Sequence, residues 1–206
     1  MYEEGTLRAE YGGECNKYQA ALDLVSVRLE NVLTLTKEGR EIVHDPPIKR
    51  IKTFESALQK AARKTGKEED DITIQDITRE VQDIAGIRLV VLTRHDIEII
   101  AQRIKNLPGI SDLKVRDYVK NPKDSGYKSF HLKVKVEIMT DDGNVGIPVE
   151  IQLRTYCMHM WAQVEHMIYK YPEERTGKFD TFRKLLGQIS VLIDKIEDYL
   201  DKFRTT

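Results

Sequence analysis

The stretch VGIPVEIQLR, residues 145–154, decides the fold because its side chains alternate in character along the chain. The apolar residues Val149, Ile151 and Leu153 occupy every second position. The positions between them are polar or charged and hold Glu150, Gln152 and Arg154. Successive side chains of a strand point to opposite faces of a sheet. The stretch therefore predicts a strand with one buried apolar face and one polar face.

A second alternating stretch, residues 131–138, precedes the first and is joined to it by the turn sequence DDGN. Its apolar positions are Leu132, Val134, Val136 and Ile138. Its polar positions are His131, Lys133, Lys135 and Glu137. Turns of this composition are typical of hairpins, so we expect two antiparallel strands. Their shared polar face carries both carboxylates and cations; a plain solvated face is the alternative interpretation.

Further elements follow from the spacing of apolar residues in the rest of the chain. The run IRLVVL, residues 87–92, predicts a buried strand that turns Arg88 to the polar face, and residues 113–119 predict another. Apolar spacing of three and four residues predicts helices over 14–37, 53–64, 73–81, 97–107, 156–169 and 179–203. This order predicts an α/β (α+β) fold in which helices flank one mixed, mostly antiparallel sheet.

Composition excludes several classes of protein. The 206 residues include 33 Lys+Arg and 34 Asp+Glu, a net charge of −1 that argues against a DNA-binding protein. Two cysteines without CxxC spacing, Cys15 and Cys157, exclude a disulfide scaffold and a cysteine zinc site. No apolar run approaches the ~20 residues that span a bilayer, and the acidic start lacks a signal segment. We therefore expect a cytoplasmic protein without a membrane partner.

Two basic segments indicate a polyphosphate ligand. The loop NPKDSGYKSFH, residues 121–131, places the ring of Tyr127 beside Lys123 and Lys128, as a nucleotide site requires. Residues 49–64 hold six basic residues against one glutamate: Lys49, Arg50, Lys52, Lys60, Arg63 and Lys64. A solvated helix face is the alternative, above all for the last two.

The glycine motifs that usually hold phosphates are missing. The chain contains neither GxxxxGK[ST] nor GxGxxG, which excludes a P-loop and a dinucleotide fingerprint. Side chains and a metal must then hold the phosphates. Asp83 and Glu150 are the natural ligands, because Mg²⁺ usually binds one or two carboxylates together with phosphate oxygens. For either carboxylate alone, a helix cap or a surface salt bridge is the alternative.

Five ordered motifs resemble the synthetase domain of the RelA/SpoT family over about residues 47–171. They are RIKTFESALQK (50–60), DIAGIR (83–88), DYVKNPKDSGYKSFH (117–131), VEIQLRT (149–155) and WAQVEH (161–166). The short chain looks like a small alarmone synthetase of this family. The pairs His44-Asp45 and His95-Asp96 lack the multi-ligand pattern of the family's hydrolase domain. We therefore expect a synthesis-only protein with a nucleotidyltransferase-like fold.

The resemblance implies an activity and its site. The activity is transfer of the β,γ-pyrophosphoryl group of ATP to the 3′-OH of GTP or GDP, which yields AMP and the stringent-response alarmone (p)ppGpp in bacteria. Asp83 would hold Mg²⁺, and Glu150 would complete the metal site or accept the proton of the 3′-OH. The residues implied on the ATP side are Arg50, Lys52, Ser56, Lys60 and Arg88.

The guanosine side follows from the same resemblance. Tyr127 would stack on guanine, while Lys123, Lys128 and His131 would contact the guanosine phosphates. Beside the same pocket fall Gln152, Arg154 and His159, although relatives carry Asn or Asp where His159 stands. Packing in a helix explains Trp161, Glu165 and His166, so these three stay outside the expected catalytic set.

The ends of the chain suggest assembly. A broad apolar stripe in the last helix predicts an oligomer interface, and packing on the N-terminal helix is the alternative. The resemblance implies a homotetramer and, in some relatives, regulation by (p)ppGpp or single-stranded RNA. We expect an N-terminal helical segment over 1–46, a synthetase core over 47–171 and an oligomerisation helix over 172–206.

Two other functions remain open from the sequence. A catalytically silent nucleotide- or RNA-binding regulator would need neither Asp83 nor Glu150, and the presence of both argues against a degenerate site. A synthetase of adenosine-based alarmones would use the same chemistry, and Tyr127 would stack on either purine.

Overall fold

One five-stranded sheet forms the centre of the computed structural model, which describes residues 4–35, 42, 45–141, 143–170 and 177–204. The strand order is β1-β2-β5-β4-β3. The strands are β1 (Ile48–Ile51), β2 (Ala85–Val91), β3 (Ile110–Asp117), β4 (Phe130–Thr140) and β5 (Gly143–Thr155). Strands β2 and β5 run parallel, and the other neighbouring pairs are antiparallel. The predicted mixed, mostly antiparallel sheet is confirmed.

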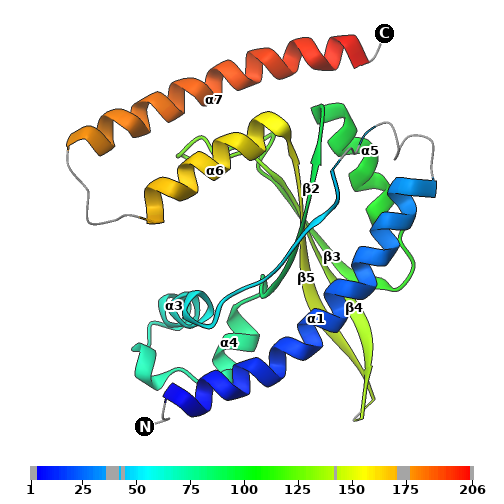
Figure 1. Cartoon of the computed structure of the whole chain (residues 1–206), viewed down its shortest axis with the longest axis vertical. Helices are drawn as coiled ribbons and strands as arrows, with labels where there is room; N and C mark the ends of the chain where they lie inside the picture. The colour runs from blue at the N-terminus through cyan, green and yellow to red at the C-terminus, as the bar shows by residue number, and fades with distance from the viewer. Residues whose placement is uncertain (1–3, 36–41, 43–44, 142, 171–176, 205–206) are drawn as a thin grey trace.

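Helices lie on both sides of this sheet (Figure 1). They are α1 (Glu4–Leu35), α3 (Phe54–Thr65), α4 (Ile74–Glu80), α5 (Arg94–Lys105), α6 (Tyr156–Lys170) and α7 (Gly177–Arg204), with a short 3-10 helix η1 (Glu69–Asp71). Helices α1 and α5 cover the apolar sheet face, and their buried Leu22 and Ile100 share one core with Leu132 and Ile151. The polar face is thereby left to the functional side chains.

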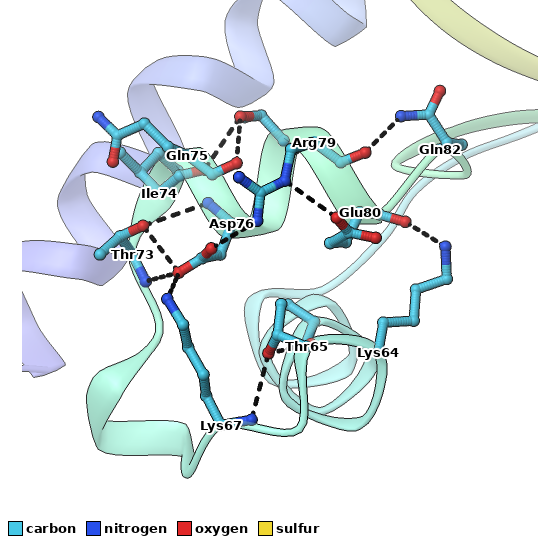
Figure 2. Close-up of polar contacts among 12 residues, drawn as sticks. Lys64, Thr65, Lys67, Thr73, Ile74, Gln75, Asp76, Arg79, Glu80 and Gln82 are labelled. Carbon is cyan, nitrogen blue, oxygen red and sulfur yellow. Dashed lines mark hydrogen bonds and ion pairs between the residues drawn. The ribbon is translucent and has the colours of Figure 1, made fainter.

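Two predicted helix starts are confirmed by their caps. The Thr53 Oγ1 accepts the Ser56 backbone N–H at the start of α3, and Gly66 ends that helix in the left-handed conformation. At α4, Thr73 and Asp76 form a reciprocal capping box (Figure 2). Such caps satisfy backbone N–H groups that lack a partner inside the helix.

The corner between α3 and α4 is a structural ion-pair cluster (Figure 2). Lys67 and Arg79 both contact the Asp76 carboxylate, at 2.7 and 3.0 Å. These contacts, led by the Lys67 hydrogen bond, lower the pKa of Asp76 to about 2. The Lys64 Nζ donates to the Glu80 carbonyl at 2.6 Å. Lys64 is exposed and donates to α4, which agrees with the solvated helix face that was the alternative to phosphate binding.

Some elements differ from their predicted bounds. Helix α1 begins ten residues before the expected start because Leu7 and Tyr11 extend its buried stripe. Strand β1 was not predicted, because it is a short edge strand whose exposed side chains give no alternation. The last two residues of the helix predicted over 14–37, His44 and the domain boundary at residue 171 lie outside the described residues.

The described part of the chain also places the His95-Asp96 pair and both cysteines. Asp96 accepts the Thr93 backbone N–H and caps α5, a structural role in the His95-Asp96 pair. Cys15 and Cys157 are free thiols. None of the described helices combines the length and apolar character needed to cross a bilayer.

Candidate active site

A cavity of about 400 Å³ opens on the polar face of the sheet, beside α6. Strand pairing sets its floor, because Gly86 lies opposite Glu150 and Arg88 opposite Gln152 in the parallel pair of β2 and β5. The residues of the predicted site that line it are Arg50, Asp83, Arg88, Tyr127, Glu150, Gln152 and Arg154. Residues far apart in sequence thus meet in one cavity.

Asp83 is the centre of the end of this cavity that was predicted to bind ATP, hereafter the ATP end. Its Oδ2 lies 2.8 Å from the Lys60 Nζ and 3.3 Å from the Lys52 Nζ. Burial opposes ionisation of Asp83, but Lys60 and Lys52 outweigh burial and hold the pKa below its ordinary value. The carboxylate is therefore charged at neutral pH. Lys52 follows β1 and Lys60 lies on α3, so two separate elements bring these cations to one anion.

A hydrogen bond from α1 supports this end. The Tyr11 hydroxyl donates to the Lys52 carbonyl at 2.7 Å, and its ring packs on Phe54 with centroids 5.7 Å apart. Burial raises the pKa of the Tyr11 hydroxyl, so the group stays protonated and remains a donor. This contact could not be predicted from the sequence, because Tyr11 lies before the helix predicted over 14–37.

Two carboxylates fit a magnesium ion here. The Asp83 Oδ1 is buried and lacks a hydrogen-bond partner among the described residues. Glu150 lines the same cavity, and its charge is near enough to act on the pKa of Asp83. The described residues hold no cluster of three or more typical metal ligands. Mg²⁺ needs only one or two carboxylates when phosphates complete its shell, so this donor set suits a metal that arrives with nucleotide.

Glu150 is held by three neighbours on the sheet. Its Oε1 accepts from the Gln152 Nε2 at 2.7 Å and lies 3.5 Å from the His131 Nδ1, and its Oε2 lies 3.8 Å from the Lys133 Nζ. Burial alone would raise the pKa of Glu150, but His131, Gln152 and Lys133 lower it to about 2. Such a carboxylate binds cations well and accepts protons poorly at neutral pH.

The end of the cavity that was predicted to bind guanosine, hereafter the guanosine end, is centred on Tyr127. Its hydroxyl accepts from the Arg154 Nη2 at 2.7 Å and lies 3.0 Å from the His131 Nε2. The Lys123 Nζ lies 4.7 Å and the Arg154 Cζ 5.1 Å from its ring centroid. The Arg154 Nη2 also donates to the Gln152 Oε1 at 3.0 Å. Polar contacts therefore run from Tyr127 to the residues that hold Glu150.

Arg88 lies between the two ends. Its guanidinium reaches the Gln152 Oε1 with both Nε and Nη2 at 3.4 Å. Burial, followed by repulsion from Arg154, lowers the pKa of Arg88 to about 10, which still leaves the group charged at neutral pH. An anion entering the cavity would relieve this repulsion.

Lys128 does not line this cavity, contrary to the expectation from sequence. Its Nζ donates to the Ser190 carbonyl, the Ser190 Oγ and the Asp194 Oδ2 of α7, at 3.1, 2.9 and 2.7 Å. All three ammonium hydrogens are thus used within the protein. A guanosine phosphate would have to break these contacts to bind Lys128.

Six further predicted residues are absent from the cavity lining. Lys52, Lys60, Lys123 and His131 contact residues that line it, whereas Ser56 and His159 have no such contact among the described residues. The Ser56 Oγ accepts from the Thr53 Oγ1 at 3.0 Å, within the cap of α3. His159 lies on α6, where burial, Arg88 and Arg154 lower its pKa. Its Nδ1 is buried and without a hydrogen-bond partner among the described residues.

Helix α6 supplies cavity residues that the sequence analysis left out. Gln163, Glu165 and His166 line the cavity, whereas Trp161 packs as expected and donates from Nε1 to the Leu186 carbonyl at 2.8 Å. Lys133, which contacts Glu150, was also left out. Its place on the polar face of β4, two residues after His131, was the signal that could have identified it.

Comparisons with known proteins agree with this geometry. A family model described as a region found in RelA/SpoT proteins matches residues 49–174. The GTP pyrophosphokinase YwaC of Bacillus subtilis is 31% identical over 169 residues, which cover 80% of this chain and 77% of YwaC. The GTP pyrophosphokinase YjbM of the same organism is 35% identical over 158 residues, which cover 75% of this chain and 71% of YjbM.

Solved structures extend the likeness to nearly the whole chain. The small alarmone synthetase 1 of Bacillus subtilis, solved with its product pppGpp, has a TM-score of 0.79 at 29% identity and covers 96% of this chain and 97% of that one. A GTP pyrophosphokinase family protein from Streptococcus pneumoniae has a TM-score of 0.79 at 26% identity and covers 95% of this chain and 93% of that one. The chain therefore belongs to the RelA/SpoT family.

Proposed function

We propose that this chain transfers the β,γ-pyrophosphoryl group of ATP to the 3′-OH of GTP or GDP. The 3′ oxygen attacks the β-phosphorus, the bond between that phosphorus and the bridging oxygen to the α-phosphate breaks, and AMP leaves. The 3′-OH loses its proton in the same reaction. The carrying observation is the single cavity that joins Asp83 and Glu150 to cations and to Tyr127.

The relatives support this choice of reaction. Both Bacillus subtilis proteins above are named GTP pyrophosphokinases. The small alarmone synthetase 1 has been solved with pppGpp and also with AMPCPP, an ATP analogue. A site that accepts both a guanosine polyphosphate and an adenosine triphosphate requires cations at both ends, and this cavity has them.

At the ATP end, Asp83 and Glu150 would hold Mg²⁺. When bound, the ion neutralises phosphate charge and orients the oxygens of ATP. Lys52 and Lys60, whose Nζ atoms both lie beside Asp83, would contact the triphosphate. Arg50 and Arg88 line the same cavity and would contact ATP.

Glu150 acts better as a metal ligand than as a general base in this proposal. Its pKa of about 2 lies far below the neutral range in which a base is efficient. Phosphoryl-type transfer depends mainly on alignment and charge neutralisation, so the loss of a strong base is tolerable. Orientation of the 3′-OH by the residues around Glu150 then supplies most of the rate.

At the guanosine end, Tyr127 would stack on the base, with Lys123 and Arg154 already beside its ring. His131 and Gln152, together with Arg154, would contact the ribose and phosphates; His159 lies on α6. Lys128 is left out of this set because its ammonium is used by α7.

The first test is a product assay with the purified chain, Mg²⁺, labelled ATP and one of GTP, GDP, GMP or ATP as acceptor. Equal amounts of AMP and a guanosine 3′-pyrophosphate are expected. AMP formed only with adenosine acceptors would keep the chemistry and overturn the guanosine pocket. A folded chain that binds nucleotide but forms no AMP would be a regulator rather than an enzyme.

Self-association is a second part of the proposal, with a homotetramer as the expected state. The outer side of α7 exposes Phe182, Leu185, Ile189, Leu192, Ile196, Tyr199 and Phe203. Figure 1 shows α7 beside α6 and apart from α1, so the alternative of packing on the N-terminal helix is not realised within one chain. Light scattering at micromolar concentration tests this part, and a monomer mass would contradict it.

A further inference from the structure

The loop that carries Tyr127, residues 121–129, is exposed over residues 121–125, half-buried at Gly126 and Tyr127, and buried at Lys128 and Ser129. On the sheet side, the Tyr118 backbone N–H donates to the Ser129 carbonyl at 3.0 Å, and the Ser129 Oγ donates to the Leu153 carbonyl at 3.3 Å. Its tip is a local turn in which the Gly126 backbone N–H donates to the Lys123 carbonyl at 2.8 Å. These contacts alone leave the residues beside Tyr127 without a support from above the sheet.

Helix α7 supplies that support through one serine. The Ser190 Oγ donates to the Gly126 carbonyl at 2.9 Å and accepts from the Lys128 Nζ at 2.9 Å. The two chain neighbours of Tyr127 are therefore fixed to the same side chain. Residues 126 and 190 are 64 positions apart, so this contact exists only because α7 folds back over the loop (Figure 1).

The loop and α7 are closely packed at Gly126. Gly126 has a φ of +89°, a conformation that glycine adopts readily. A Cβ at this position would lie 3.1 Å from the Ser190 Cβ and 3.4 Å from the Trp161 ring. Glycine is thus required here both by its backbone conformation and by the approach of α7 and α6.

The contact between Lys128 and Asp194 pairs a buried cation with its counter-charge. The Lys128 side chain is only 7% exposed, and Asp194, 44% exposed, is its charged partner at 2.7 Å. A buried cation that loses its counter-charge is strongly unfavourable unless it moves toward water. Such a movement would carry Tyr127, the next residue, with it. The Tyr127 hydroxyl contacts with Arg154 and His131 would then be disturbed.

We propose that Ser190 and Asp194 of α7 are positioning residues for the guanosine acceptor, acting through Lys128 and Gly126 on Tyr127. This inference rests on the proposed function, because it assumes that the acceptor stacks on Tyr127. Helix α7 therefore serves the active site directly and is more than an interface for assembly.

The test compares two carboxylates of the same helix. Asp194→Asn removes the partner of Lys128, whereas Asp198→Asn removes a partner of Arg94 that ties α7 to α5. With Asp194→Asn we expect the KM for the guanosine nucleotide to rise about tenfold or more, since small misplacements of this kind are costly. The KM for ATP stays unchanged. With Asp198→Asn both constants stay unchanged, although α7 also loses an ion pair.

Two further variants of Lys128 distinguish an effect on the position of Tyr127 from a general loss of stability. Lys128→Met is expected to act like Asp194→Asn, and Lys128→Arg, which keeps the cation, is expected to restore most of the acceptor affinity. The double variant Lys128→Met/Asp194→Asn should be no worse than the single ones, because both remove one contact. Equal acceptor constants in Asp194→Asn and Asp198→Asn would overturn the proposal.

Tryptophan fluorescence gives a readout that does not need turnover. The chain has one tryptophan, Trp161, whose ring centroid lies 6.5 Å from that of Tyr127 and whose Nε1 donates to α7. Titration with GDP should show about tenfold weaker binding for Asp194→Asn than for Asp198→Asn. If the wild-type chain binds GDP but forms no AMP, the proposed function fails and this titration still decides the inference. If it does not bind GDP, the inference fails too.

Discussion

The two ends of the candidate active site are built in different ways. At the ATP end, Lys52, Lys60 and Asp83 lie at the end of β1, on α3 and just before β2, so backbone pairing and a helix cap set their positions. At the guanosine end, Tyr127 lies on a loop whose support comes from side chains of α7. The positions of the first set are fixed by regular secondary structure that packs on the core through Phe54 of α3 and Ala85 of β2. The second depends on a few polar contacts and is the easier place for acceptor preference to vary.

The largest effect is expected from a substitution at the ATP end. Glu150→Gln removes a charge from the proposed metal site while keeping the size of the side chain. We expect turnover to fall by about 10²–10⁴-fold, because a metal ion that neutralises phosphate charge contributes several kcal/mol to transition-state stabilisation, with ATP binding largely kept. AMP formation and an equilibrium titration with ATP measure the two quantities. Glu137→Gln, on the exposed part of β4, is the matched control and should be silent; a Glu150→Gln enzyme of near-normal turnover would remove Glu150 from the mechanism.

The next effect falls on the guanosine end. Tyr127→Ala removes the ring, and base stacking on an aromatic side chain contributes about 1–3 kcal/mol. The KM for GTP or GDP should therefore rise by roughly 10–100-fold, with the KM for ATP unchanged. Tyr127→Phe keeps the ring but loses the hydroxyl contacts with Arg154 and His131, so a smaller rise is expected. A parallel loss of ATP affinity would show that the two ends are not separate.

A smaller effect on activity, but a clear one on stability, is expected from pH. Glu197 of α7 is fully buried, and its Oε1 accepts from the Thr155 hydroxyl. Burial raises the pKa of Glu197 to about 7, against the opposing effects of Thr155 and Arg94. The other charged or titratable groups that act on it are Asp194 and Asp201 of α7 and Cys157 of α6.

The folded state binds the Glu197 proton more tightly than the unfolded state does. The folded state holds the Glu197 proton up to about pH 7, whereas the unfolded state releases it near its ordinary pKa of 4.5. This stabilisation, about 3 kcal/mol, is complete below pH 4.5 and is lost as pH rises through 7. Urea unfolding between pH 5 and pH 8 measures it. In Glu197→Gln this part of the pH dependence should vanish, and an unchanged profile would show that Glu197 does not titrate in this range.

The smallest effect should leave both ends of the site intact. Thr73→Ala removes the cap of α4, which lies in the ion-pair corner of Figure 2. The free energy of unfolding should fall by about 1 kcal/mol, and both KM values should stay as in the wild type. Urea unfolding with the product assay checks this. A change in acceptor affinity would show that the start of α4 also affects the guanosine end.

Local patterns were enough to predict much of this molecule. Alternation along 145–154 and 131–138 revealed two strands and their polar face, because side chains on a strand have a period of two. Apolar spacing located the helices, because side chains on a helix have a period of 3.6 residues. Ordered motifs were sufficient to indicate the family and the carboxylates Asp83 and Glu150, since each carboxylate lies within or just before a strand that alternation or an apolar run predicted.

Only the tertiary structure decided which partners the remaining side chains take. Lys128 looks like a phosphate ligand in sequence, yet its ammonium donates hydrogen bonds to Ser190 and Asp194 of α7, which are 62 and 66 residues away. Tyr11 is one apolar position in a helix, yet its hydroxyl supports Lys52 from 41 residues away. Glu165 and His166 face the cavity because α6 lies beside the sheet. Contacts at such separations leave no periodic trace in the chain, because they depend on how whole elements pack rather than on the residues next to them.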